Sequence, residues 1–430
     1  MPNLERVRRL SIEGAWIVLG QAAAVLGSLA GVRLLTELLD PAAYGELALG
    51  MTAAAAVNQT MIGPLGNGVA RFYAPAQERG DLGGYLNSVR RLVSEATAVI
   101  VLMILLTVAG LLVAGRTQWI GIAVAALVFA AVSGYNGILS GIQNAARQRA
   151  IVALHQGMEP WARFLIAAGL LLWLGATSTV AMAGYAFAVM LMLGSQYFFF
   201  QKTVPWSATA AYEEKNWRQQ IWKYSWPFGA WGVFSWAQQV SDRWVLELFA
   251  TTQEVGLYAA LFQLGYYPMS MAAGTSMQFF GPLFFQRAGD ASDGRRNEKV
   301  SRLSWRLTWL TLALTGAVFI VALLLHTQVF RVLVAEEYAS VSYLLPWMLL
   351  AGGIFAAGQT IALDLMSQMK TQTIAVAKIA TSSLGIIFNI AGAYFFGIEG
   401  IVAAIVLFSV LYSAWLAAIS IRAAAKPPIQ

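Results

Sequence analysis

Charged residues inside long apolar stretches are the positions of this 430-residue chain where chemistry is expected. Glu159 and Arg163 lie four residues apart, so a helix places them on one face, where they can form an ion pair. Asp242 and Arg243 end another apolar stretch, and Asp364 lies near the end of a third. Ionisable groups at membrane depth are costly and usually face a bundle interior. Glu159, Asp242 and Asp364 are therefore the candidates for binding a coupling ion, H⁺ or Na⁺.

Basic residues occur in both halves of the chain, beside neutral amides. Arg71, Arg163 and Lys378 lie deep or nearly deep in apolar stretches. Charged donors of this kind bind phosphate, and together they attract anions. A cavity lined in this way suits an anionic, hydroxyl-rich solute such as a sugar on a phosphate. Further candidates for the cavity lining are Asn67, Asn136, Arg33 and Arg243.

Each of these candidates also has a structural explanation. Amides often hydrogen-bond between membrane helices, and Arg71 also fits a positive flank on the cytoplasmic side. Arg33 and Arg243 each begin an Arg-x-x-x-Glu pattern, which fits a helix end at the outer interface equally well. A cation exporter would concentrate buried carboxylates, whereas this chain has few. The pattern as a whole therefore favours an anionic solute.

Signatures of covalent chemistry are missing from the sequence. The chain has no cysteine, so disulfides and thiolate chemistry are excluded. His155 and His326 lie far apart and form no metal-ligand spacing. Glycine loops that hold nucleotide phosphates are absent, and no pair of carboxylates shows a spacing suited to cleaving sugars. We therefore expect neither an enzyme nor a bound metal or cofactor.

The composition is that of a polytopic membrane protein. Charged residues make up 11% of the chain and the mean hydropathy is +0.63, whereas soluble proteins carry about 25% charged residues. About 20 apolar residues cross a bilayer as a helix. The sequence therefore predicts an all-α fold with about twelve transmembrane helices. The predicted spans are 12–34, 44–66, 92–114, 118–141, 157–176, 178–200, 221–247, 254–284, 304–326, 339–365, 372–396 and 399–422.

Positive charge orients these spans. When the N-terminus is placed in the cytoplasm, 23 of the 28 Lys and Arg residues fall on the cytoplasmic side and four on the other, with Arg163 inside a span. This asymmetry follows the positive-inside rule and predicts that both termini are cytoplasmic. The net charge of +7 is then explained by cytoplasmic loops, and we expect no nucleic-acid partner.

A weak repeat divides the chain into two similar halves. Arg33 and Glu37 recur 210 residues later as Arg243 and Glu247, and each copy ends one apolar segment and leads into the next. The polar mid-chain loop separates two sets of six predicted spans. The predicted domains are therefore an N-terminal lobe at 1–200, a cytoplasmic inter-lobe loop at 201–220 and a C-terminal lobe at 221–430.

The first 80 residues carry a family resemblance. The residues concerned are Gly20-Gln21, Arg33-Leu34-Leu35-Thr36, Pro41 with Tyr44-Gly45, and Gly66-Asn67-Gly68-Val69-Ala70-Arg71-Phe72-Tyr73. This pattern resembles the polysaccharide-biosynthesis and O-antigen flippases of the multidrug/oligosaccharidyl-lipid/polysaccharide (MOP) exporter superfamily. The spacing of twelve spans and the two-half repeat extend the resemblance to the whole chain.

The resemblance implies two six-helix lobes in a V shape around a central cavity that opens alternately to each face. The implied cargo is an undecaprenyl-diphosphate-linked oligosaccharide of O-antigen, capsule or exopolysaccharide type, moved from the inner to the outer leaflet of the cytoplasmic membrane. Other polysaccharide-assembly membrane proteins would be its partners. The resemblance gives basic residues facing the cleft a role in binding, and Arg71, Arg163 and Lys378 are the expected positions.

Three other functions remain open at this stage. A multidrug or cation antiporter of the same superfamily would be expected to show more buried carboxylates. A membrane polymerase or ligase would be expected to carry a sizeable outer loop with catalytic groups. A membrane scaffold would gain nothing from buried charges in both halves of the chain.

Overall fold

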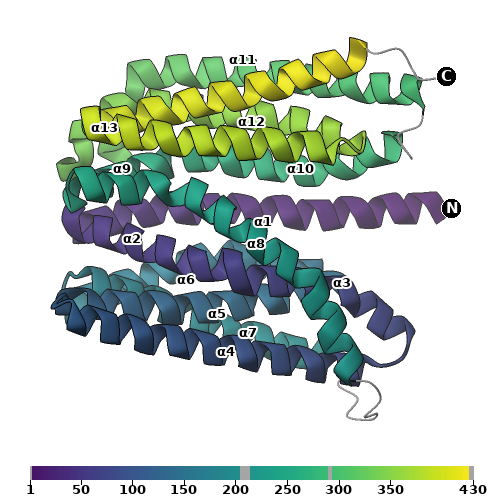
Figure 1. The fold of residues 1–430 in the computed structure, drawn as a ribbon, viewed down its shortest axis with the longest axis horizontal. Coiled ribbons are helices and arrows are strands. Elements are labelled where there is room, and N and C mark those ends of the chain that lie inside the picture. Colours follow the sequence, from purple (N-terminus) through teal and green to yellow (C-terminus); the bar gives the residue numbers. More distant parts are fainter. Residues whose placement is uncertain (1, 204–213, 289–292, 426–430) are drawn as a thin grey trace. The chain divides into compact units, whose positions relative to one another are not determined.

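The computed structural model describes residues 2–203, 214–288 and 293–425, and every regular element within them is a helix (Figure 1). The first half consists of α1 (Pro2–Leu38), α2 (Pro41–Val57), the π-helical turn η1 (Asn58–Ile62), α3 (Gly63–Glu78), α4 (Leu82–Val113), the 3₁₀ turn η2 (Thr117–Trp119), α5 (Ile120–Ala145), α6 (Arg149–Leu174) and α7 (Ser178–Thr203). The second half consists of α8 (Glu214–Phe249), α9 (Thr252–Leu264), α10 (Tyr266–Ala288), α11 (Gly294–Leu333), the 3₁₀ segment η3 (Glu336–Leu344), α12 (Leu345–Ser367) and α13 (Thr371–Ala425).

The predicted apolar spans all fall within helical structure. The span at 254–284 is divided between α9 and α10 at Gly265. The last two spans lie in α13, which breaks between them at Gly397, where φ is 55°. Only glycine adopts this left-handed conformation readily. Within the described residues, seven helical stretches are long and apolar enough to cross a membrane.

The chain folds into two compact units. One contains the residues up to Leu39 together with Glu46–Val240, and the other contains Asp40–Gly45 together with the residues from Ser241 onward. The first part of α8 therefore belongs to the first unit, whereas the sequence places residues 214–220 in the inter-lobe loop and the rest of this helix in the second lobe. Residues 204–213 of the predicted inter-lobe loop lie outside the described residues.

In the first unit, α1 packs along α6, while α7 packs on α5 and on α6. Small residues permit the close approach of these helices. A Cβ atom at Gly184 would lie 2.6 Å from the Cα of Ala167, and a Cβ atom at Gly31 would overlap the ring of Phe164. Membrane helices gain packing contacts in this way, because lipid provides no hydrophobic drive for their association.

In the second unit, α12 is the central helix and packs against α10, α11 and α13 (Figure 1). Ile361 and Leu365 of α12 are buried against Tyr412 and Leu416 of α13. Asp364, also in α12, has no exposed surface.

Candidate functional site

A stripe of small residues packs α8 against α2, η1 and α3 in the first unit. A Cβ atom at Gly232 would lie 1.9 Å from the carbonyl oxygen of Gln59, and one at Gly229 would lie 2.7 Å from that of Thr60. Similarly, a Cβ atom at Gly68 of α3 would lie 2.2 Å from the Ser225 hydroxyl oxygen. The two backbones are therefore in contact, and only glycine fits at these positions.

The π-helical turn η1 lies at the centre of this contact. The Gly63 N–H bonds to the carbonyl of Asn58, five residues earlier. Single π-helical turns inside α-helices frequently mark functional sites. The Asn58 amide donates to the Ser133 hydroxyl at 3.0 Å.

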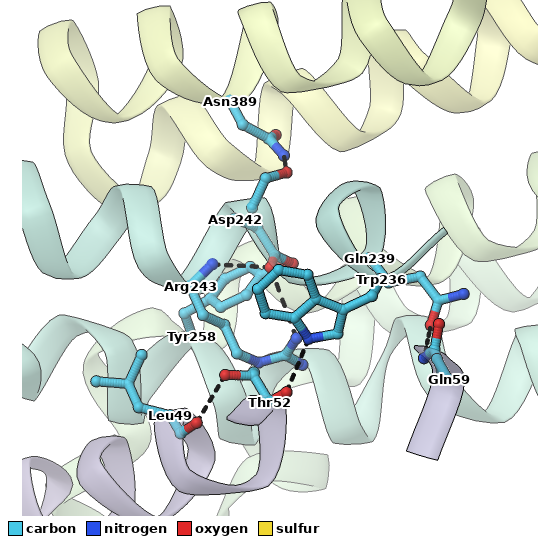
Figure 2. Close-up of polar contacts among 10 residues, drawn as sticks. Leu49, Thr52, Gln59, Trp236, Gln239, Asp242, Arg243, Tyr258 and Asn389 are labelled. Carbon is cyan, nitrogen blue, oxygen red and sulfur yellow. Dashed lines mark hydrogen bonds and ion pairs between the residues drawn. The ribbon is translucent and has the colours of Figure 1, made fainter. Parts of the chain in front are cut away.

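Two glutamines join α8 to this turn. The Gln59 side-chain amide donates to the carbonyl oxygen of the Gln239 side chain at 3.1 Å, and Gln239 is exposed (Figure 2). One turn nearer the start of α8, the Trp236 indole N–H donates to the carbonyl of Thr52 at 2.8 Å. An exposed amide pair at membrane depth requires a polar neighbour other than lipid.

Arg71 and Asn67 lie one turn apart on α3, and both are exposed. Arg71 forms no ion pair with any described residue. The Arg71 guanidinium is therefore available to an anion.

The predicted ion pair between Glu159 and Arg163 is present, with 3.8 Å between Oε1 and Nη1. The Arg163 guanidinium also lies over two rings, 5.1 Å from the centroid of Phe164 and 5.0 Å from that of Tyr185. Its side chain is 17% exposed. Residues of α6 and α7 therefore hold the Arg163 guanidinium in place, whereas Arg71 has no such ion pair with any described residue.

Asn136 and Arg33 complete the predicted set in the first unit. Asn136 is buried in α5, and its Oδ1 atom accepts no hydrogen bond from the described residues. Arg33 forms an ion pair with Glu37 near the end of α1. This pairing fits the alternative in which Arg33 ends a helix.

In the second unit, Asp242 is the centre of a buried polar cluster (Figure 2). It accepts hydrogen bonds from the Tyr258 hydroxyl and from the Arg243 backbone N–H, the latter at 2.7 Å. The Arg243 Nη1 lies 3.6 Å from Asp242 Oδ1, and the guanidinium lies 4.5 Å from the ring centroid of Phe262. Next to Asp242, Ser241 accepts a hydrogen bond from the Asn389 amide of α13 at 2.9 Å.

Tyr258, Phe262 and Asn389 are contributions that the sequence alone did not assign to this cluster. Tyr258 follows Asp242 by 16 residues and comes from the next helix. Asn389 stood among several amides with no indicated partner. The signal that could have indicated these contacts was the presence of aromatic residues about one helix length after Asp242.

Asp364 and Lys378 lie at different places in the second unit. Asp364 accepts a hydrogen bond from the Gln368 amide at 2.8 Å, and Gln368 in turn accepts from the Lys370 ammonium at 2.7 Å. Burial lowers the pKa of Lys370, which follows the end of α12, and the charge of Asp364 partly opposes that shift. Lys378 is half-buried in α13 and forms no ion pair within the described part of the chain.

No protein-family model matches the sequence, and no curated protein matches it. Solved structures do share its fold. A structure of the lipid II flippase MurJ in an inward closed conformation matches with a TM-score of 0.68 and 14% identity, covering 96% of this chain and 87% of that one.

Transporters match equally well. An inward-facing multidrug resistance MATE family transporter of the MOP superfamily gives a TM-score of 0.69 at 13% identity, covering 97% of this chain and 98% of that one. An outward-facing MATE transporter gives 0.60 at 13% identity, covering 96% and 94%. The chain therefore shares the fold of these MurJ and MATE structures over nearly its full length.

Proposed function

We propose that this chain is a MOP-type flippase that moves an undecaprenyl-diphosphate-linked oligosaccharide from the inner to the outer leaflet of the cytoplasmic membrane. The observation that carries the proposal is which basic residues form ion pairs and which do not. Arg163 and Arg243 are each paired with a carboxylate and stacked on aromatic rings. Arg71 and Lys378 form no ion pair with any described residue, so each unit contains an unpaired cation at or near membrane depth.

An unpaired cation at or near membrane depth needs an anionic partner, because desolvating a charge without one is costly. A diphosphate supplies that partner, and an arginine binds phosphate oxygens with two parallel hydrogen bonds. The mechanism is alternating access, and the cargo shifts the balance between the two states only by its different affinity for them. Both termini face the cytoplasm in this proposal, and the partners are the membrane proteins that assemble and extend the glycan.

Coupling to H⁺ or Na⁺ would involve the cluster around Asp242. Its carboxylate is buried yet has several donors nearby, including Tyr258 and Arg243. Gain or loss of a cation at this position would change its bonds to α9 and would bias the second unit between two arrangements.

A multidrug or cation antiporter is the second candidate. The likeness to the MATE structures equals the likeness to MurJ, so the fold alone does not choose between the two. The buried carboxylates Asp242 and Asp364 favour a cationic solute. Against it, Asp242 is already neutralised by Arg243, whereas an antiporter needs a carboxylate that its solute can reach.

The test measures the amount of lipid-linked glycan in a deletion strain, separately in each leaflet. We expect the lipid-linked glycan to accumulate in the inner leaflet. Wild-type protein should restore export, and Arg71→Ala should not, whereas Arg90→Ala at an exposed site on α4 serves as the matched control. Unchanged glycan export in the deletion strain, together with increased sensitivity to cationic drugs, would replace the flippase with the antiporter.

A further inference from the structure

The exposed face of α8 differs from that of α4, another long helix. Tyr224, Phe228 and Trp231 are 38%, 42% and 41% exposed, and their spacing of four and three residues places them on one side of the helix. The exposed large hydrophobic side chains of α4 are all aliphatic or Met. Among the described residues, α8 is also missing from the stretches apolar enough to span a membrane on their own. Its surface is therefore unlike one selected for lipid alone.

The contacts of α8 show which side this aromatic face occupies. Trp217, Ser225 and Gly232 of α8 contact Phe72, Gly68 and Gln59 in turn, so α8 runs antiparallel to α2 and α3. The contacting residues of α8 form a line along the helix. At 3.6 residues per turn, Tyr224, Phe228 and Trp231 lie together on one side of that line and form an aromatic face.

At the same 3.6 residues per turn, counted from the contacting residues Gly68 and Phe72, Asn67 and Arg71 of α3 lie on the same side of the contact as the aromatic face. Trp222 and Trp226, both 58% exposed, lie on the opposite side of α8. A ring contact of 5.9 Å between Phe72 and Tyr224 joins the two helices beside Arg71. The aromatic face, the exposed arginine and the exposed amide are therefore neighbours in the first unit.

We propose that this face, defined by Tyr224, Phe228 and Trp231, binds the sugar rings of the cargo, with Arg71 binding the diphosphate. The proposal rests on the proposed function and adds a site for the glycan. The face of an aromatic ring is negative and attracts the C–H groups on the apolar side of a pyranose ring. Amide groups such as those of Asn67 and Gln239 both donate to and accept from hydroxyls.

The positions along α8 give the cargo a direction. A rise of 1.5 Å per residue separates Tyr224 from Trp231 by about 10 Å along the helix axis. Arg71 lies beside the Tyr224 end, through its neighbour Phe72, and Gln239 lies two turns beyond Trp231. The diphosphate therefore lies near the start of the aromatic face, and the glycan extends from it toward the Gln59–Gln239 pair.

The test compares two tryptophans on opposite sides of α8. Trp231→Leu and Trp226→Leu remove the same ring from exposed positions. Binding to purified protein in nanodiscs is measured for undecaprenyl diphosphate bearing an N-acetylglucosamine disaccharide and for bare undecaprenyl diphosphate. We expect Trp231→Leu to weaken binding of the sugar-bearing lipid roughly 3- to 10-fold and to leave the bare lipid unchanged. Trp226→Leu should change neither, and Trp231→Tyr should retain binding.

Two results would overturn the proposal in distinguishable ways. Equal losses for both tryptophan variants, or equal loss of both lipids with Trp231→Leu, would reject the glycan face and leave the flippase intact. Failure of wild-type protein to bind either lipid would reject the proposed function, and the glycan face with it.

Discussion

Gly45 and Gly256, which follow Glu37 and Glu247 of the two repeat copies by eight and nine residues, contact each other in the second unit. A Cβ atom at Gly45 would lie 2.1 Å from the carbonyl oxygen of Thr252, and one at Gly256 would lie 1.7 Å from that of Pro41. Pro41 precedes Gly45 by four residues, and Thr252 precedes Gly256 by four. The contact is therefore reciprocal, so the first turns of α2 and α9 cross around a local two-fold axis.

Substitution at this crossing should destabilise the fold. Gly256→Ala places a methyl group against backbone that cannot move aside, and overpacking of this kind costs about 1–3 kcal/mol. We expect a lower temperature of thermal unfolding in detergent. Gly316→Ala in α11 is the control, because its Cβ would meet no atom within 4 Å. Equal unfolding temperatures for the two variants would show that the crossing adjusts freely.

Asp242 and Arg243 should depend on each other for stability. Removing one partner of a buried pair costs about 3–5 kcal/mol because the other charge loses its compensation. Asp242→Ala should therefore destabilise the protein strongly, and the double variant Asp242→Ala/Arg243→Met should recover part of that loss. Thermal unfolding of the two single variants and the double variant gives the coupling free energy. Additive effects would contradict the ion pair.

Arg163 should act on stability more than on cargo binding. Its guanidinium is held by Glu159 and by the Tyr185 and Phe164 rings, and a cation–π contact contributes about 0.5–2 kcal/mol. Arg163→Met should lower the unfolding temperature. It should leave the dissociation constant for undecaprenyl diphosphate within about twofold of the wild-type value. A loss of affinity at unchanged stability would instead place Arg163 in the binding cavity, as the sequence predicts.

Lys378 should show the opposite behaviour. A half-buried ammonium without a carboxylate partner among the described residues costs stability. Lys378→Met keeps a similar length and should raise the free energy of unfolding by about 0.5–2 kcal/mol while reducing glycan export. Lys378→Arg retains the charge and is the control for function. Reduced stability with normal export would show that Lys378 is a packing residue.

Sequence alone could predict the helices because apolar length is a local property. About 20 apolar residues must span the bilayer whatever surrounds them, so each predicted span falls on a helix. The pair of Glu159 and Arg163 was predictable for the same reason, since both lie on one helix four residues apart. Apolar length does not reveal the break at Gly265, because apolar residues continue on both sides of it, although Gly265 and Pro268 are local signals for a break.

Contacts between distant helices could not be predicted in this way. Tyr258 bonds to Asp242 only because α9 folds back along α8, and several other tyrosines were equally eligible. The same holds for Gln59 and Gln239, which are 180 residues apart in the sequence. Tyr185 and Phe262 likewise reach Arg163 and Arg243 from other helices, so sequence could identify the local ion pairs and could not predict these ring contacts.

The π-helical turn at Asn58–Ile62 also sets the rotational register of α3. A π-helical turn holds one residue more than an α-helical turn, so η1 takes up one additional residue within a single turn. If the same residues formed regular α-helical turns, everything downstream would be rotated by up to about 100°. Asn67 and Arg71 would then point away from their present side of α8. The orientation of these two residues is therefore determined by the π-helical turn upstream as much as by their own identity.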